Sequence, residues 1–166
     1  MRRRNIFRRW VQLNTLALAS LILLSGQARS EDWPMWRHDA SRSSATREQL
    51  PASLSLQWSR QLVESRMAWP EDPRIHFDSV SEPVYAGGLL FVPSATTDSV
   101  TAMDAATGTV RWKFYADGPV RFAPVVAHQQ VYFGADDGFI YCLQAATGKL
   151  QWRQAARPSD RQAIGS

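Results

Sequence analysis

The chain has 166 residues, enough for about one domain, and its 45% hydrophobic and 20% charged residues are ordinary for a folded protein. Six of its positive charges are arginines within the first thirty residues, which contain no acid; without them the formal charge of +4 becomes −2, which argues against nucleic-acid binding. The single cysteine, Cys142, excludes a disulfide framework within the chain and a thiolate zinc cluster, and we expect it to be a small buried strand residue.

Residues 1–30 are predicted to be a helical signal peptide for export. Five arginines precede an apolar run at about 16–24, and small residues follow it, so that cleavage fits after either Ala28 or Ser30. An uncleaved anchor is the alternative, but the run is shorter than the about 20 residues of a stable membrane span. We therefore expect an exported protein, periplasmic or extracellular in a bacterium, with no stable span after cleavage.

Residues 31–80 are predicted to be an irregular leader, because Pro34 and a serine-rich run oppose regular structure at its start. His38 stands beside Asp39, a pair that suits acid/base or metal chemistry. No third ligand follows at a recognisable spacing, so a solvated turn is the favoured interpretation. Trp33 and Trp36 suggest that this part of the leader packs on an apolar surface.

Two further features lie in the leader. Residues 54–62 alternate apolar and polar side chains, which predicts an isolated half-buried strand carrying Trp58. Residues 63–80 contain two prolines and form a predicted loop insertion. Its acids and His76 could line a site, since functional residues favour long loops, but an ordinary surface loop is the favoured interpretation.

A unit of about 40 residues then occurs twice, at 81–120 and 121–157, and each copy offers four short strands separated by turn residues. The third strand is apolar at nearly every position, as expected of a strand covered on both faces. Such a repeat is typical of a propeller blade, so we predict an all-β fold: a partial β-propeller of about two four-stranded antiparallel blades. The predicted strands are 83–85, 89–92, 100–103 and 109–114, then 124–126, 131–133, 139–143 and 149–154.

The turn before each fourth strand contains the same tetrapeptide, Ala-Ala-Thr-Gly. Asp104 is expected to accept hydrogen bonds from backbone N–H groups of this turn, and Gln144 should cap the second copy less well. Gly108 and Gly148 should close the turns with positive φ. In the fourth strands we expect Val110, Trp112 and Phe114 to share one face, and Leu150 and Trp152 to do the same.

The sequence Asp136-Asp137-Gly138 predicts a tight hairpin, because glycine takes the positive φ that such a turn needs. Two acids beside a glycine are also part of some calcium loops, but the later ligands of such a loop are missing here. We therefore predict a hairpin.

The segment from Ala102 to Trp112 matches in full the pattern Ala-x-Asp-x-x-Thr-Gly-x-x-x-Trp and resembles the repeat of pyrrolo-quinoline quinone (PQQ)-like propellers. The second copy departs from the pattern at Cys142 and Gln144. The resemblance covers about 54–157 and extends to secreted bacterial proteins labelled PQQ-binding-like or BamB-like. It implies that the Trp packs between neighbouring blades and that residues 54–62 complete the last blade of a closed ring. The repeat-motif residues are Asp104, Thr107, Gly108, Trp112, Thr147, Gly148 and Trp152.

Two blades cannot close a ring, since propellers have about four to eight. We therefore expect an N-terminal piece of a longer protein, or a truncated reading frame, with residues 158–166 as the start of an interblade connection. Its partners would be other blades of a longer parent chain or another protein, and no nucleic acid.

The repeats favour a non-catalytic exported scaffold or protein-interaction platform, with no catalytic, cofactor-binding or metal-binding residue assigned. The alternative is the N-terminal part of a PQQ- and calcium-dependent quinoprotein dehydrogenase whose active site lies in missing blades. That chemistry needs a catalytic carboxylate, metal-ligating oxygens and a platform for the quinone, and no segment matches such a site. Binding of a polysaccharide or surface ligand through 63–80 is a third, weaker hypothesis.

Overall fold

The computed structural model describes residues 30–63 and 82–156. The chain divides into two units, 1–30 and 31–166, and the second holds every described residue except Ser30. Nearly all of the predicted signal peptide, nearly all of the 63–80 loop and the whole 158–166 connection lie outside the described residues. Within the described ranges, no helix has the length and apolar character to cross a membrane.

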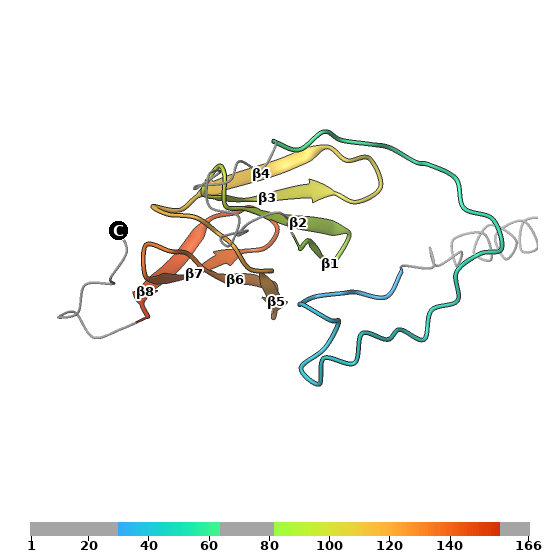
Figure 1. Ribbon diagram of the computed structural model, residues 1–166, viewed down its shortest axis with the longest axis horizontal. Helices are drawn as coiled ribbons and strands as arrows, with labels where there is room; N and C mark the ends of the chain where they lie inside the picture. Colours follow the sequence, from blue (N-terminus) through green and yellow to red (C-terminus); the bar gives the residue numbers. More distant parts are fainter. Residues whose placement is uncertain (1–29, 64–81, 157–166) are drawn as a thin grey trace, which may run out of the picture. The chain divides into compact units, whose positions relative to one another are not determined.

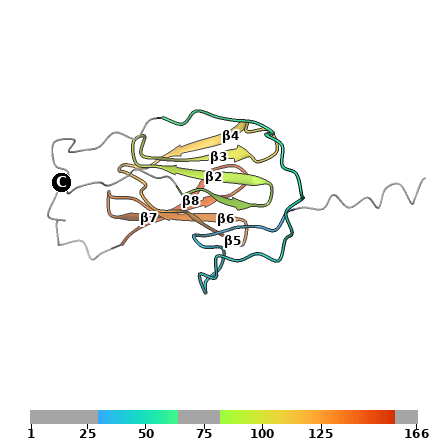
Figure 2. The same ribbon diagram turned by 45° about the vertical axis from the view of Figure 1, so that its right-hand side comes forward.

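The second unit contains two four-stranded antiparallel sheets, as predicted (Figures 1 and 2). In each sheet the strands lie in chain order, so that every neighbour pair is joined by a short turn. Each strand lies within two residues of its predicted position. Sheet one is β1 (Val84–Ala86), β2 (Leu89–Ser94), β3 (Ser99–Asp104) and β4 (Val110–Tyr115); sheet two is β5 (Val125–Ala127), β6 (Gln130–Gly134), β7 (Phe139–Gln144) and β8 (Leu150–Ala155).

One face of each sheet carries the tryptophan of its last strand, and we name it the front face; the other is the back face. The front face of sheet one packs on the back face of sheet two and forms the main core. Phe114 bridges them, with its ring 6.0 Å from Phe133 and 5.6 Å from Tyr141 in edge-on contacts. The fully buried side chains of this core include Val84, Phe91, Val100, Ala102, Val131, Leu143 and Tyr141.

Within each sheet the third strand has the most buried residues, four in β3 and three in β7, as their apolar composition predicted. Met103 is 2% exposed and Cys142 is fully buried as a free thiol. Burial raises the pKa of the Cys142 thiol, so the group is held in its neutral form.

The prediction that Val110 shares a face of β4 with Trp112 is wrong. Val110 pairs with Met103 while Trp112 pairs with Ala102, so Arg111 is an extra residue in β4. Such a β-bulge breaks the alternation of side chains, which places Val110 on the back face, opposite Trp112. Sheet two repeats the irregularity, because Leu150 pairs with Leu143 and Trp152 with Cys142.

The predicted strand at 54–62 is also wrong, since no residue there belongs to a strand. An alternating pattern describes side chains, whereas a strand also needs a neighbouring backbone edge for its hydrogen bonds. Leu54 and Leu56 are 75% and 84% exposed, and only Trp58 is partly buried. The segment is therefore attached through side chains rather than through a ladder.

Replacing Gly148 with alanine should destabilise the fold by about 2 kcal/mol or more. Gly148 has a φ of +70°, and an added Cβ would lie 2.5 Å from Cδ2 of Trp112. The matched control is Gly134→Ala, where a Cβ meets nothing within 4 Å and φ is not positive. Urea denaturation should show a loss confined to Gly148→Ala; equal effects in both variants would contradict this account.

Candidate functional site: the tryptophan docks and the leader

The repeat motif forms a contact between the two sheets. The Trp112 ring, from β4, lies against Gly148 in the last turn of sheet two, and its Nε1 donates to the Ala145 carbonyl at 2.8 Å. Because Gly148 has no side chain and a positive φ, the turn can both close tightly and receive the indole. We call this arrangement a tryptophan dock; it places Trp112 between the blades, as the resemblance implied.

Trp58 makes the same contact one repeat earlier. Its Nε1 donates to the Ala105 carbonyl at 2.9 Å, and a Cβ on Gly108 would lie 2.7 Å from its ring. Arg60 adds a hydrogen bond from its guanidinium to the Gly108 carbonyl at 3.2 Å. The leader therefore supplies a tryptophan in the position that a preceding blade would otherwise fill.

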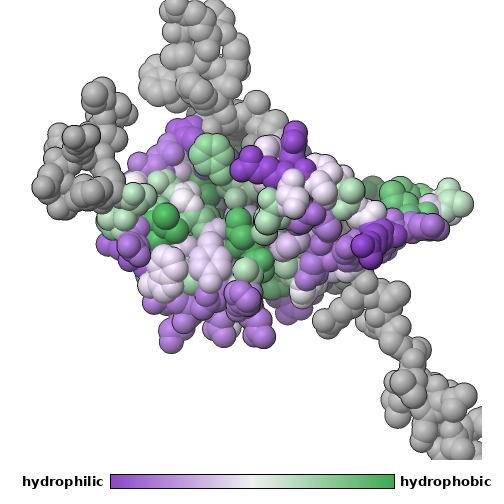
Figure 3. Space-filling view, turned by 90° about the horizontal axis from the view of Figure 1, so that it is seen from below, coloured by the Kyte–Doolittle hydropathy of each residue, from purple (hydrophilic) through white to green (hydrophobic). Residues whose placement is uncertain are grey.

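Trp152, the third tryptophan of the series, has no dock among the described residues. It is 42% exposed, and its nearest described ring is Tyr132, with centroids 6.1 Å apart. Ile140, on the same front face of sheet two, is also 42% exposed. Apolar side chains are visible among polar ones on the surface in Figure 3. The front face of sheet two thus has exposed apolar side chains, whereas the front face of sheet one is buried against sheet two.

Asp104 caps the first docking turn as expected. Its Oδ1 accepts from the backbone N–H groups of Ala106 and Thr107, both at 3.1 Å, and its Oδ2 accepts from Arg111 at 2.8 Å. Arg111 first, and then the Thr107 hydroxyl, hold the pKa of Asp104 below its ordinary value of 3.8. Arg111, the extra residue of the β-bulge, therefore stabilises the capping carboxylate of the turn and does not pack in the core.

Gln144 is a poorer cap in the second copy, as predicted. Its Oε1 accepts from the Thr147 hydroxyl at 2.7 Å. Among the described residues, no backbone N–H donates to its side chain, although the backbone carbonyl of Gln144 accepts from Gly148 at 2.8 Å. The backbone geometry of the turn is kept while side-chain capping is reduced.

The predicted hairpin at Asp136-Asp137-Gly138 is confirmed, with Gly138 at a φ of +85°. Asp137 accepts from the Phe139 N–H at 2.9 Å and from the Tyr141 hydroxyl, and Asp136 pairs with Arg121. Both carboxylates thus engage groups of the protein. In the described part of the chain, no three His, Cys, Asp or Glu side chains are grouped to hold a metal ion.

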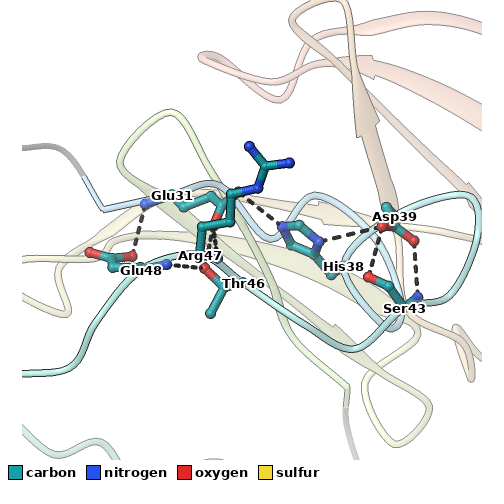
Figure 4. Close-up of polar contacts among 7 residues, drawn as sticks. All are labelled: Glu31, His38, Asp39, Ser43, Thr46, Arg47 and Glu48. Atoms are coloured by element: carbon teal, nitrogen blue, oxygen red, sulfur yellow. Dashed lines mark hydrogen bonds and ion pairs between the residues drawn. The ribbon is translucent and has the colours of Figure 1, made fainter.

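His38 lies in a turn, as predicted, since its backbone N–H donates to the Met35 carbonyl at 3.0 Å, but its side chain is packed rather than solvated (Figure 4). Its side chain is 16% exposed; its Nε2 is 3.6 Å from Glu31 and its Nδ1 3.7 Å from Asp39. The ring also packs on Trp33, with centroids 4.8 Å apart. Sequence adjacency revealed only Asp39, because the other partners approach through the fold of the leader.

Hydrogen bonds lower the pKa of both carboxyl groups beside His38. For Glu31 the largest cause is the Thr46 hydroxyl, and for Asp39 it is the Ser43 backbone N–H, 3.0 Å from Oδ1. His38 Nδ1 is buried without a hydrogen-bond partner among the described residues. The two carboxylates, of Glu31 and Asp39, thus lie near the imidazole of His38, but neither forms a hydrogen bond with Nδ1.

Residues 32–34 tie the two sheets together, a role that the sequence did not reveal. Trp33 exchanges backbone hydrogen bonds with Tyr85 of β1, at 2.7 and 2.9 Å, and the Pro34 carbonyl accepts from Val126 of β5 at 2.7 Å. We call this segment the leader strap. Backbone donors and acceptors carry no residue signature, and of the two tryptophans from which packing was predicted, Trp33 is partly buried. Trp36 instead is 42% exposed, with the guanidinium groups of Arg37 and Arg42 over its ring.

Two four-stranded blades joined by a tryptophan dock define a β-propeller repeat protein. Residues 34–166 match the family described as outer membrane protein assembly factor BamB, and the chain belongs to this family.

The chain is similar to parts of three longer proteins. The dehydrogenase subunit of the quinone alcohol dehydrogenase of Gluconobacter oxydans (strain 621H) is 29% identical over 110 residues, which are 58% of this chain and 14% of that protein. The quinohemoprotein alcohol dehydrogenase of Comamonas testosteroni shares the fold with a TM-score of 0.63 and 24% identity, over 85% of this chain and 22% of that one. BamB from Moraxella catarrhalis aligns with a TM-score of 0.39 and 22% identity, over 42% and 21%. The chain thus spans a minor share of each relative.

The charge of Asp104 should stabilise the fold in a pH-dependent manner. Because its folded pKa is lowered, its contribution is present above pH 3.8 and is lost as the pH falls through the folded value. Asp104→Asn keeps the shape but removes the charge, so the variant should unfold at lower urea than the parent at neutral pH. The difference should vanish in strong acid. A difference that is constant with pH would contradict the assigned role of the Arg111 pair.

Trp112→Phe should lower the free energy of unfolding by about 1–3 kcal/mol, because the smaller phenyl ring loses part of the packing on Gly148 as well as the hydrogen bond to Ala145. The control is Trp36→Phe, whose tryptophan is 42% exposed in the leader. Its unfolding midpoint should stay near that of the parent. If both variants unfold alike, the indole N–H does not hold the dock.

Proposed function

We propose that this chain contributes to an exported, non-catalytic propeller module that acts as a scaffold or protein-interaction platform in the assembly of outer-membrane proteins. The observation that carries the proposal is the use of the repeat motif: its tryptophans, glycines and capping carboxylate hold blades together. Membership of the BamB family over 34–166 supports this choice. Under this proposal residues 1–30 direct export to the periplasm or beyond, and the described residues take no cofactor.

The similarity to the Gluconobacter quinone alcohol dehydrogenase favours a second candidate. In it, the chain is the N-terminal part of a PQQ- and calcium-dependent dehydrogenase whose catalytic groups lie in further blades. The described sheets would then form part of the wall of that propeller, and the docks would serve its rigidity.

Deleting the gene in its native host should separate the two functions. The scaffold proposal expects folded outer-membrane β-barrel proteins to decrease and to recover when the intact gene is restored. Dye-linked alcohol oxidation in membranes supplied with PQQ and calcium should be unchanged. Loss of that oxidation with normal barrel proteins would overturn the proposal and establish the dehydrogenase.

A Trp112→Ala gene gives a matched control in the same host. If the platform depends on docked blades, this variant should reproduce the deletion phenotype, whereas Trp36→Ala should restore the parent phenotype. Equal recovery with both variants would show that the docks are not needed for the activity.

A further inference from the structure

The two sheets leave one matching face each without a sheet as partner in the described part of the chain. On the front face of sheet two, the register aligns Val125, Tyr132, Cys142 and Trp152 across the four strands. On the front face of sheet one, Val84, Phe91, Ala102 and Trp112 occupy the same positions, and that face is buried against sheet two. The exposed front face of sheet two therefore has the same arrangement of side-chain positions as the front face of sheet one, which packs on the back face of sheet two.

The back face of sheet one has the complementary layout. Leu90 and Met103 pair there, as Val131 and Leu143 pair on the back face of sheet two that receives sheet one. The turn at its edge carries Gly108 and the Ala105 carbonyl, the equivalents of Gly148 and Ala145. All the elements of a tryptophan dock are thus present on this side.

The present occupant of that dock is a substitute for a blade. Trp58 fills the ring position and makes the hydrogen bond to Ala105, but residues 54–62 form no strand. Leu62 is 47% exposed, and Leu54 and Leu56 are more exposed still. A full sheet with its own tryptophan would bury more apolar surface here than this single segment does.

We propose that a second copy of this chain occupies the dock. The front face of sheet two in one copy packs on the back face of sheet one in the next, and Trp152 replaces Trp58 against Gly108. Its indole N–H, which has no acceptor among the described residues, then donates to the Ala105 carbonyl. This interaction is independent of the scaffold function proposed above.

The contact is head-to-tail, because the two copies use different surfaces. Such heterologous contacts build rings when the rotation closes. The rotation between successive copies would repeat the one that already relates sheet one to sheet two within the chain.

Sedimentation velocity of the purified full chain over a range of concentrations tests the association. We expect reversible oligomers that Trp152→Ala reduces to monomers. Trp58→Ala removes the competitor and should shift the association midpoint to about tenfold lower concentration. The control is Trp36→Ala, which removes a tryptophan of the same 42% exposure from the leader and should leave the midpoint unchanged.

Trp152→Ala is expected to weaken association and Trp58→Ala to strengthen it, so a general loss of stability cannot explain both results. A parent chain that stays monomeric at every concentration overturns the proposal, and so does association that survives Trp152→Ala. If circular dichroism shows that Trp152→Ala is misfolded, Ile140→Lys on the same face takes its place and should also give monomers.

Cross-linking distinguishes a head-to-tail contact from a two-fold symmetric one. Phe114 contacts Tyr141 within the chain, and their repeat equivalents are Gln154 and Thr101, so these two positions should meet between copies. In a Cys142→Ala background, which matches Ala102 of the first repeat, we would introduce Gln154→Cys or Thr101→Cys. A short bismaleimide should link a mixture of the two variants into dimers and leave each variant alone unlinked. Cross-linking of either variant with itself overturns the proposal.

Discussion

The contact of an indole with a glycine turn is the interaction on which this structure depends. At Gly148 the backbone must have a positive φ to close the turn, and the missing side chain leaves room for Trp112. One residue thus satisfies a local requirement of the chain and a packing requirement between sheets. The hydrogen bond from the indole to the Ala145 carbonyl fixes the direction of approach. Since the same three groups recur at Trp58, Gly108 and Ala105, the relation between neighbouring units is encoded in a short repeated motif.

This arrangement explains why the conspicuous motif is structural. Asp104 uses one carboxylate oxygen for the turn and the other for Arg111, which leaves its charge engaged within the blade. Arg111 is free to reach Asp104 because the bulge in β4 removes it from the regular pairing. The functional surfaces of such a protein are therefore to be sought on the outer faces and edges of its sheets.

The strands were predictable because their turns are marked by glycine and aspartate and their third members are apolar throughout. The faces of Val110 and Leu150 were not, because a period of two assumes an unbroken register and nothing in the composition of β4 announces a bulge. The setting of His38 was missed for a different reason: Glu31 and Trp33 reach it through a fold of the leader without regular structure. At 54–62 the alternating pattern correctly marked Trp58 as partly buried, while the predicted strand needed a neighbouring backbone edge that it does not have among the described residues.

The leader strap also has a kinetic consequence. Trp33 and Pro34 lie near the start of the described chain, yet their backbone partners, Tyr85 and Val126, are far along it. During synthesis from the N-terminus, the backbone groups of Trp33 remain unpaired until β1 has emerged, and the Pro34 carbonyl remains unpaired until β5, the first strand of sheet two, has emerged. Closing contacts of such long sequence separation slows folding relative to the local hairpins within each sheet. The hairpins should therefore form first, with the leader captured last, and the final step should be the one most exposed to competing association.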